Sequence, residues 1–139
     1  MGPTMVLAAF FVQTGTFTWP VLLISLPIGL TVTAIMHCNN LRDIDEDKLQ
    51  HKRTIAVFLG WEHGRYFYAA LLISNYVLIS LFAILEILPV FTLFGLITIP
   101  LAFQTAKGIW SAKERLTMNQ AMIRTALLHL YSGLVISFG

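Results

Sequence analysis

Charged residues are scarce in this sequence, and their scarcity excludes a soluble domain. Asp, Glu, Lys and Arg make up 12% of the 139 residues, whereas soluble domains contain about 25%. Hydrophobic side chains account for 57% of the chain, and the mean hydropathy is +0.76. A chain of this composition belongs in a lipid bilayer. Because each crossing needs about 20 apolar residues, the length allows four spans with short connections and no separate soluble domain.

Cysteine is almost absent, since Cys38 is the only one. This excludes a disulfide framework and a zinc ribbon built from several thiols within one chain. No basic residue precedes Arg42, so the N-terminus lacks the positive segment of a secretory signal and is not set aside as a targeting peptide. The net charge of +2 is small, and the basic residues form no stripe with interleaved aromatics. We therefore expect no nucleic-acid partner.

The apolar runs predict an all-α fold, a transmembrane helical bundle that forms a single domain over residues 1–139. Each of four runs is long enough to cross a bilayer core. A shorter apolar run at 4–12 cannot cross alone and has the length of half a transmembrane helix. The four predicted spans are 19–38, 65–84, 87–106 and 119–138.

The charges lie in two polar islands, which predict the orientation in the membrane. Ten of the sixteen charges lie between Arg42 and Arg65, five lie between Lys107 and Arg124, and Glu86 stands alone. The turns on the opposite side, at 13–18 and 85–87, contain no basic residue. The positive-inside rule then places the loop 39–64 and the turn 107–118 in the cytoplasm and the C-terminus outside.

The first polar island contains all three aspartates of the chain. If the preceding helix continues, Asn40, Asp43 and Asp47 fall on one face at i, i+3 and i+7. Carboxylates this close favour a shared cation, and Mg²⁺ typically takes one or two carboxylates together with substrate phosphate oxygens. Lys52 and Arg53 follow, with donors suited to those oxygens. The spacing alone is equally typical of ion pairs on a solvated cytoplasmic helix.

The whole segment is more specific than its spacing. It resembles the second aspartate-rich motif of the UbiA superfamily of intramembrane aromatic prenyltransferases, most closely in the branch that prenylates 1,4-dihydroxy-2-naphthoate during menaquinone synthesis. The residues that carry the resemblance are Asn39-Asn40-x-Arg42-Asp43-xxx-Asp47-xxx-His51-Lys52-Arg53-Thr54, followed by Ile55-Ala56-Val57-xx-Gly60. Two positions depart from the family pattern, since His51 stands where glycine is usual and Phe58 where a basic residue is common. Glycine at the first position would permit a tight turn that histidine restricts.

The resemblance implies a membrane enzyme of about nine helices in two halves around a central cavity, each half with its own aspartate-rich motif. Mg²⁺ would be the cofactor, a polyprenyl diphosphate the donor and a dihydroxynaphthoate-like aromatic the acceptor, in a bacterial inner or plasma membrane. By this resemblance Asp43 and Asp47 are the catalytic Mg²⁺ ligands, and Lys52 and Arg53 bind the diphosphate. Asn39, Asn40 and Arg42 are then rim residues that orient the substrate or the carboxylates.

The other family motif, NDxxDxxxD, cannot lie in this sequence because every aspartate lies between positions 43 and 47. We therefore expect the chain to be the C-terminal half of such an enzyme, inactive alone and completed by a separately encoded N-terminal half. One alternative is a non-enzymatic membrane protein that binds lipid diphosphates or acts as a scaffold. A small four-span transporter subunit is weaker, because transport sites usually place polar groups near the bilayer midplane. Polar groups within the spans, such as Tyr76 and His129, are expected to bond neighbouring helices.

Overall fold

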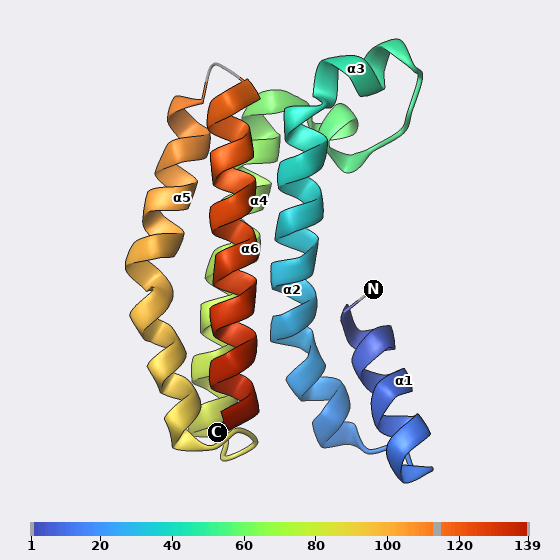
Figure 1. Ribbon diagram of the computed structural model, residues 1–139, viewed down its shortest axis with the longest axis vertical. Coiled ribbons are helices and arrows are strands. Elements are labelled where there is room, and N and C mark those ends of the chain that lie inside the picture. The colour runs from blue at the N-terminus through green and yellow to red at the C-terminus, as the bar shows by residue number, and fades with distance from the viewer. Residues whose placement is uncertain (1, 113–114, 139) are drawn as a thin grey trace.

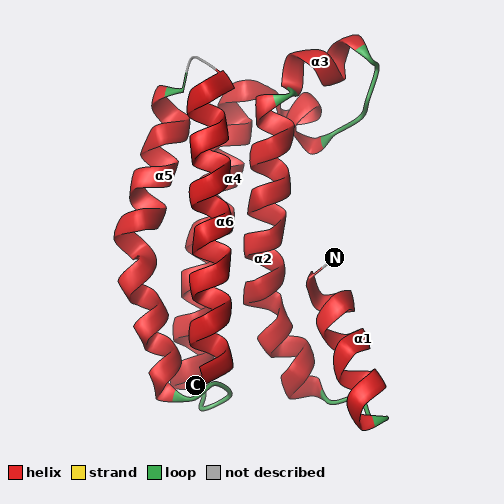
Figure 2. Ribbon diagram, in the orientation of Figure 1, coloured by secondary structure: helices red, strands yellow, loops and turns green. Residues whose placement is uncertain are grey.

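The computed structural model describes residues 2–112 and 115–138. Within these residues the chain is mostly helical, with short connecting loops, and contains no strand (Figure 2), which confirms the predicted all-α fold. The elements, labelled in Figure 1, are α1 (Gly2–Thr14), α2 (Trp19–Arg42), α3 (Ile44–Leu49), α4 (Ile55–Ile84), the 3₁₀ helix η1 (Val90–Thr98), α5 (Ile99–Ser111) and α6 (Arg115–Phe138).

Four long segments form one antiparallel bundle. Helix α2 packs against α4 and α6, and α5, which continues from η1, closes the bundle between α4 and α6. Helix α1 lies outside this bundle against the lower half of α2 (Figure 1). The core is built from all four long helices, and its fully buried members include Leu41 of α2, Tyr68 of α4, Ile109 of α5 and Leu128 of α6.

The observed helices agree with the predicted spans, with changes at their ends. Three segments in the described part are long and apolar enough to cross a membrane, namely Trp19–Arg42, Ile55–Ile84 and Val90–Ser111. Helix α6 covers the fourth predicted span, and its 24 residues extend about 36 Å, enough for a bilayer core. Helix α1, with 13 residues, is too short to cross alone, as predicted.

Two irregularities were not visible in the apolar pattern. Helix α4 begins ten residues before the predicted span, and it is interrupted at Gly60, whose φ of 74° and ψ of 175° are not helical. Such a φ favours glycine, which has no Cβ to clash with the backbone. The third span is a 3₁₀ helix for its first nine residues, a length that is uncommon because 3₁₀ hydrogen bonds have poorer geometry than α-helical ones.

Proline and glycine position the helices. Pro20 and Pro100 lie in the first turns of α2 and α5, where the missing N–H removes no helical hydrogen bond. The close α1–α2 crossing requires glycine at position 2, because a Cβ there would overlap the Gly29 backbone. Small residues at such crossings are typical of helix packing in membranes.

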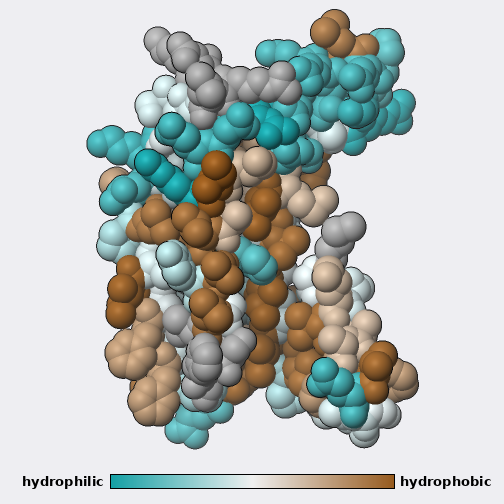
Figure 3. Space-filling model, viewed as in Figure 1, coloured by the Kyte–Doolittle hydropathy of each residue, from teal (hydrophilic) through white to brown (hydrophobic). Residues whose placement is uncertain are grey.

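The surface is divided between apolar sides and a polar end. Figure 3 shows hydrophobic residues along the sides of the bundle and hydrophilic residues gathered at the end that carries α3. Many large apolar side chains on the sides are exposed, including Ile73, Phe103 and Ile97. Exposed apolar area of this extent is expected where lipid, rather than water, surrounds the helices.

The segment predicted as the loop 39–64 is largely helical. It contains the last turn of α2, the whole of α3 and the start of α4, so that only residue 43 and residues 50–54 lie outside helices. Helix α3 leaves the bundle sideways at the end of α2 (Figure 1). The condition under which Asn40, Asp43 and Asp47 would share one face of a continuous helix is therefore not met, because α2 ends at Arg42.

Candidate functional site

The chain turns at Asp43, directly after the last residue of α2. Asp43 has φ −100° and ψ 13°, which ends α2 and starts α3. Its carbonyl accepts a hydrogen bond from the Asp47 backbone N–H at 2.9 Å, so the two aspartates are held one helical turn apart. The structure thus brings the predicted residues Asn39, Arg42, Asp43 and Asp47 to one end of the bundle, although not along a single helix.

Arg42 is the centre of this site. Its Nε and Nη2 donate to the two carboxylate oxygens of Asp43, each at 2.7 Å. Nη2 also donates to Asn39 Oδ1 at 2.7 Å, and Nη1 donates to Asn119 Oδ1 at 3.0 Å and approaches Met122 Sδ at 3.8 Å. A guanidinium has five N–H donors, and these five acceptors account for all of them.

This arrangement fixes the orientation of the Asp43 carboxylate. A bidentate pair between arginine and a carboxylate is planar and directional, and the side chains of both residues are more than four-fifths buried. Through Asn119, the same guanidinium ties the end of α2 to the beginning of α6. Asn119 was not among the predicted site residues, because it is 77 positions from Arg42 and no local pattern connects the two.

Asp47 makes a separate ion pair. Its side chain is 8% exposed and accepts a hydrogen bond from Lys52 Nζ at 3.2 Å, while the Lys52 side chain is 57% exposed. The backbone N–H of Lys52 donates to the Asp47 carbonyl at 2.9 Å, so the turn itself places the two residues together. A buried carboxylate is therefore joined to a cation that reaches the surface.

The turn between α3 and α4 explains one departure from the family pattern. His51 has a φ of 55°, which lies in the left-handed region that glycine adopts without strain. Histidine tolerates this region better than most residues with a side chain. The position therefore requires the conformation for which glycine is suited, and the histidine adopts it.

Thr54 ends the turn, where its Oγ1 accepts a hydrogen bond from the Val57 backbone N–H at 3.2 Å as the N-cap of α4.

Two predicted residues stand apart from these networks. Asn40 is half-buried on the last turn of α2, and Arg53 is exposed beside Lys52. Neither side chain makes a hydrogen bond or ion pair with any side chain of residues 2–112 and 117–134. Arg53 has donors available for an anionic ligand at the surface.

The donor set fits a divalent cation that is shared with a ligand. The described residues contain no group of three or more His, Cys, Asp or Glu side chains able to hold a metal without further ligands. Two carboxylates fixed one turn apart are, however, the protein contribution that Mg²⁺ usually takes when phosphate oxygens complete its coordination. Lys52 and Arg53 lie beside them in the sequence, as contacts to such phosphates would require.

Polar side chains within the bundle bond other helices, as predicted for Tyr76 and His129. Tyr76 OH lies 2.8 Å from Thr98 Oγ1, and His129 Nδ1 lies 2.7 Å from Thr31 Oγ1. Each pair joins two helices in the apolar part of the bundle, where a polar group needs a protein partner.

Comparison with known proteins gives one family for the whole chain. The model of the UbiA prenyltransferase family matches residues 1–132. The chain is 34% identical over 134 residues to the UbiA prenyltransferase domain-containing protein 1 homolog of Drosophila melanogaster, covering 96% of this chain and 36% of that protein. It is 31% identical over 139 residues to the 1,4-dihydroxy-2-naphthoate octaprenyltransferase of Bacillus subtilis, covering 100% of this chain and 45% of that enzyme. The octaprenyltransferase of the same name from Escherichia coli is 28% identical, with 96% and 44% covered. The chain thus spans less than half the length of these relatives.

Proposed function

Because this chain belongs to the UbiA prenyltransferase family, we propose that it forms one of the two diphosphate-binding halves of an aromatic prenyltransferase. The reaction is the transfer of a polyprenyl group from its diphosphate to 1,4-dihydroxy-2-naphthoate, as the names of the bacterial relatives indicate for those enzymes. The observation that carries the proposal is the pair of fixed carboxylates, Asp43 and Asp47, beside the cations Lys52 and Arg53 at the polar end of the bundle.

Each side chain has a distinct task in this proposal. Asp43 and Asp47 hold Mg²⁺, which when bound neutralises negative charge on the leaving diphosphate. Lys52 and Arg53 donate hydrogen bonds to the phosphate oxygens. Lys52 releases Asp47 when it bonds these oxygens. Arg42 is a positioning residue, because its N–H donors are all used within the protein and hold the Asp43 carboxylate in place.

Asn39 and Asn40 lie at the rim of the same site. Asn39 orients Arg42 through its side-chain oxygen, whereas the side chain of Asn40 has no partner in the described part of the chain and is assigned to the substrate. The apolar helices below the site exclude water from the reacting allylic carbon.

The other aspartate-rich motif of such an enzyme is not among these 139 residues, because all three aspartates lie between positions 43 and 47. We therefore propose that the chain is inactive alone and that a separate N-terminal half completes the enzyme. The polar end faces the cytoplasm by the positive-inside rule, and the bacterial relatives favour a bacterial plasma membrane, although the family also includes animal proteins.

A binding experiment tests the metal and diphosphate roles. The 139-residue chain in lipid nanodiscs is incubated with tritiated geranylgeranyl diphosphate, with Mg²⁺ or with a chelator. We expect binding only with Mg²⁺, and a loss of at least about tenfold in Asp43→Asn or Asp47→Asn, since a charge-assisted bond contributes about 1.5–3 kcal/mol. Asp45→Asn is the matched control, because its side chain on the same helix is 92% exposed and should bind as the parent does. Equal binding by all three variants would refute these assignments.

A complementation experiment separates an enzyme from a binding protein. The chain is expressed alone or together with the N-terminal half of the Bacillus subtilis octaprenyltransferase, and prenylated naphthoquinone is measured by chromatography. We expect product only from the pair, and none when the chain carries Asp43→Asn. Mg²⁺-dependent binding without product from the pair would favour a lipid-diphosphate binding protein instead.

A further inference from the structure

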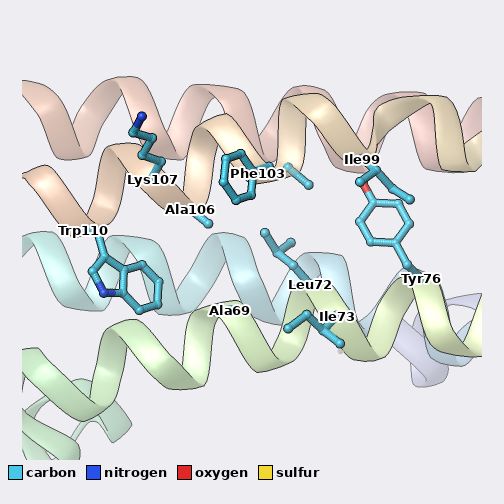
Figure 4. Close-up of a pocket in the computed structure, with 10 residues that line it drawn as sticks. Ala69, Leu72, Ile73, Tyr76, Ile99, Phe103, Ala106, Lys107 and Trp110 are labelled. Carbon is cyan, nitrogen blue, oxygen red and sulfur yellow. The ribbon is translucent and has the colours of Figure 1, made fainter.

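A cavity lies on the side of the bundle, between α4 and α5. These two helices pack less closely than α2 and α4 or α5 and α6, and the space between them has a volume of about 600 Å³. Its walls are apolar, from Ala69, Leu72 and Ile73 on α4 and Ala102, Phe103 and Ala106 on α5 (Figure 4). No residue of α2 or α3 lines it, so it is separate from the aspartate site.

The dimensions of this groove match one leaflet of a bilayer. Along α5 it extends from Ile99 to Trp110, which at 1.5 Å per residue is about 16 Å. The hydrocarbon core of a membrane is about 30 Å thick, so the groove runs through about half of it. Ile73 and Phe103 are largely exposed at its mouth, and the groove therefore opens to the surrounding lipid.

Only one end of the groove carries basic residues. Figure 4 shows Lys107 and Trp110 at this end, with the Lys107 amine directed toward the outside of the groove, and Tyr76 and Ile99 at the other end. Arg65 lies beside Trp110, donating from Nη1 to its carbonyl at 3.1 Å, with Cζ 5.9 Å from the indole centroid. This end lies on the same side of the bundle as α3, where the surface is hydrophilic (Figure 3).

Arg65 and Lys107 have charged N–H groups that lack partners among the described residues. The Nε–H of Arg65 is buried and has no hydrogen-bond partner among the described residues. Lys107 forms no ion pair within the same part of the chain. A buried donor without a partner is costly, and an anion at this end would supply an acceptor for the arginine and a counter-charge for the lysine.

We propose that this groove is a binding site for an anionic phospholipid, with an acyl chain along α4 and α5 and the phosphate held by Lys107 and Arg65. Basic pockets between transmembrane helices are suited to anionic headgroups, and the apolar length below them is that of a chain in one leaflet. The basic residues at one end favour an anionic lipid over an uncharged apolar occupant. The proposal is independent of the prenyltransferase function.

Fluorescence quenching of Trp110 tests the site. The substitutions Trp19→Phe and Trp61→Phe leave Trp110 as the only tryptophan. This variant is reconstituted in phosphatidylcholine bilayers. Phosphatidylglycerol or phosphatidylcholine with brominated acyl chains is then added in increasing mole fraction. We expect phosphatidylglycerol to quench at a mole fraction at least about fivefold lower, since one basic residue near the surface contributes about 1 kcal/mol to anionic lipid binding.

Two variants identify the headgroup and acyl-chain contacts. Lys107→Gln should lower the preference for phosphatidylglycerol about fivefold. Lys48→Gln removes the same charge from an exposed position of α3 and should leave the preference unchanged. Ala106→Phe, which fills the groove, should weaken quenching by both lipids, and circular dichroism confirms that each variant remains helical.

Three results would overturn the proposal. Equal quenching by the two brominated lipids would show that the headgroup is not recognised. Unchanged quenching in Ala106→Phe would show that the acyl chain does not occupy the groove. Displacement of brominated phosphatidylglycerol by geranylgeranyl diphosphate at equal concentration would assign the groove to the prenyl donor rather than to a membrane lipid.

Discussion

The phenolic oxygen of Tyr68 on α4 lies 2.7 Å from Thr125 Oγ1 on α6, and both residues are fully buried. Thr125 Oγ1 itself donates to the Ala121 carbonyl at 2.7 Å. Since a threonine hydroxyl has one hydrogen, Tyr68 is the donor of the shared bond. Helices α4 and α6 make no close backbone contact in the described part of the chain, so this bond joins opposite sides of the bundle.

Removing the Tyr68 hydroxyl should loosen the bundle. We expect Tyr68→Phe to lower the free energy of unfolding by about 0.6–1.7 kcal/mol, the range for hydrogen bonds between membrane helices, because the ring still fills its place in the core. The measurement is unfolding in mixed detergent micelles with increasing dodecyl sulfate. Tyr131→Phe is the control, since Tyr131 on α6 is exposed. Equal stability of the two variants would mean that the Tyr68 bond contributes nothing.

Arg42→Gln should release α3 from the end of the bundle. The substitution removes the bidentate partner of Asp43, whose carboxylate is only 18% exposed, and a buried charge without its partner is strongly destabilising. Hydrogen exchange followed by mass spectrometry should show at least about tenfold faster exchange of the α3 amides. Exchange in α5 should be unchanged, because that helix does not contact Arg42.

Lys48→Gln is the matched control for Arg42→Gln. It removes the same charge from α3, but the pair of Lys48 with Asp45 is exposed and its atoms are 4.0 Å apart. Exposed pairs of this kind contribute little to stability. If both variants speed exchange in α3 equally, loss of positive charge rather than the Arg42 network is the cause.

The span positions were predictable because they depend only on the composition of each segment. Three of the four apolar runs correspond to segments apolar and long enough to cross a membrane, and α6 covers the fourth. The break at Asp43 was missed in the apolar pattern, although an aspartate followed by the acidic residues of 45–47 is typical of a helix N-terminus.

The sequence indicated candidate residues that the structure places at the polar end, but it did not indicate how they are connected. The aspartates and the cations after them could be identified by resemblance, and the turn at 50–54 brings Lys52 to Asp47. Asn119 could not be identified, because its role depends on α6 packing against the end of α2. Contacts between distant segments follow from the packing of the whole bundle, which a local pattern does not encode.

The backbone at His51 predicts an asymmetry between two substitutions. His51→Val should lower the free energy of unfolding by about 1–2 kcal/mol, because a β-branched residue is strained at a φ of 55°. His51→Gly should be close to neutral, because relief of strain is offset by the greater freedom of glycine in the unfolded chain. Both are measured by unfolding in mixed micelles.

Gln50→Val is the control for the loss of a polar side chain in the same turn. Gln50 is exposed and has an ordinary φ of −86°, so valine adds little strain there. Should Gln50→Val destabilise as much as His51→Val, hydrophobicity in the turn, not the backbone conformation, would account for the effect.

The proposed orientation can be tested with two single cysteines at opposite ends of the bundle. Asp45 on α3 and Thr16 in the turn between α1 and α2 are both exposed, whereas the native Cys38 is fully buried and should remain unlabelled. With the polar end in the cytoplasm, a membrane-impermeant maleimide should label Thr16→Cys in intact bacterial cells. It should label Asp45→Cys only after the membrane is permeabilised. The reverse pattern would place Lys52 and Arg53 outside the cell, away from a cytoplasmic prenyl diphosphate, and would contradict the proposed orientation while leaving the geometry of the site unchanged.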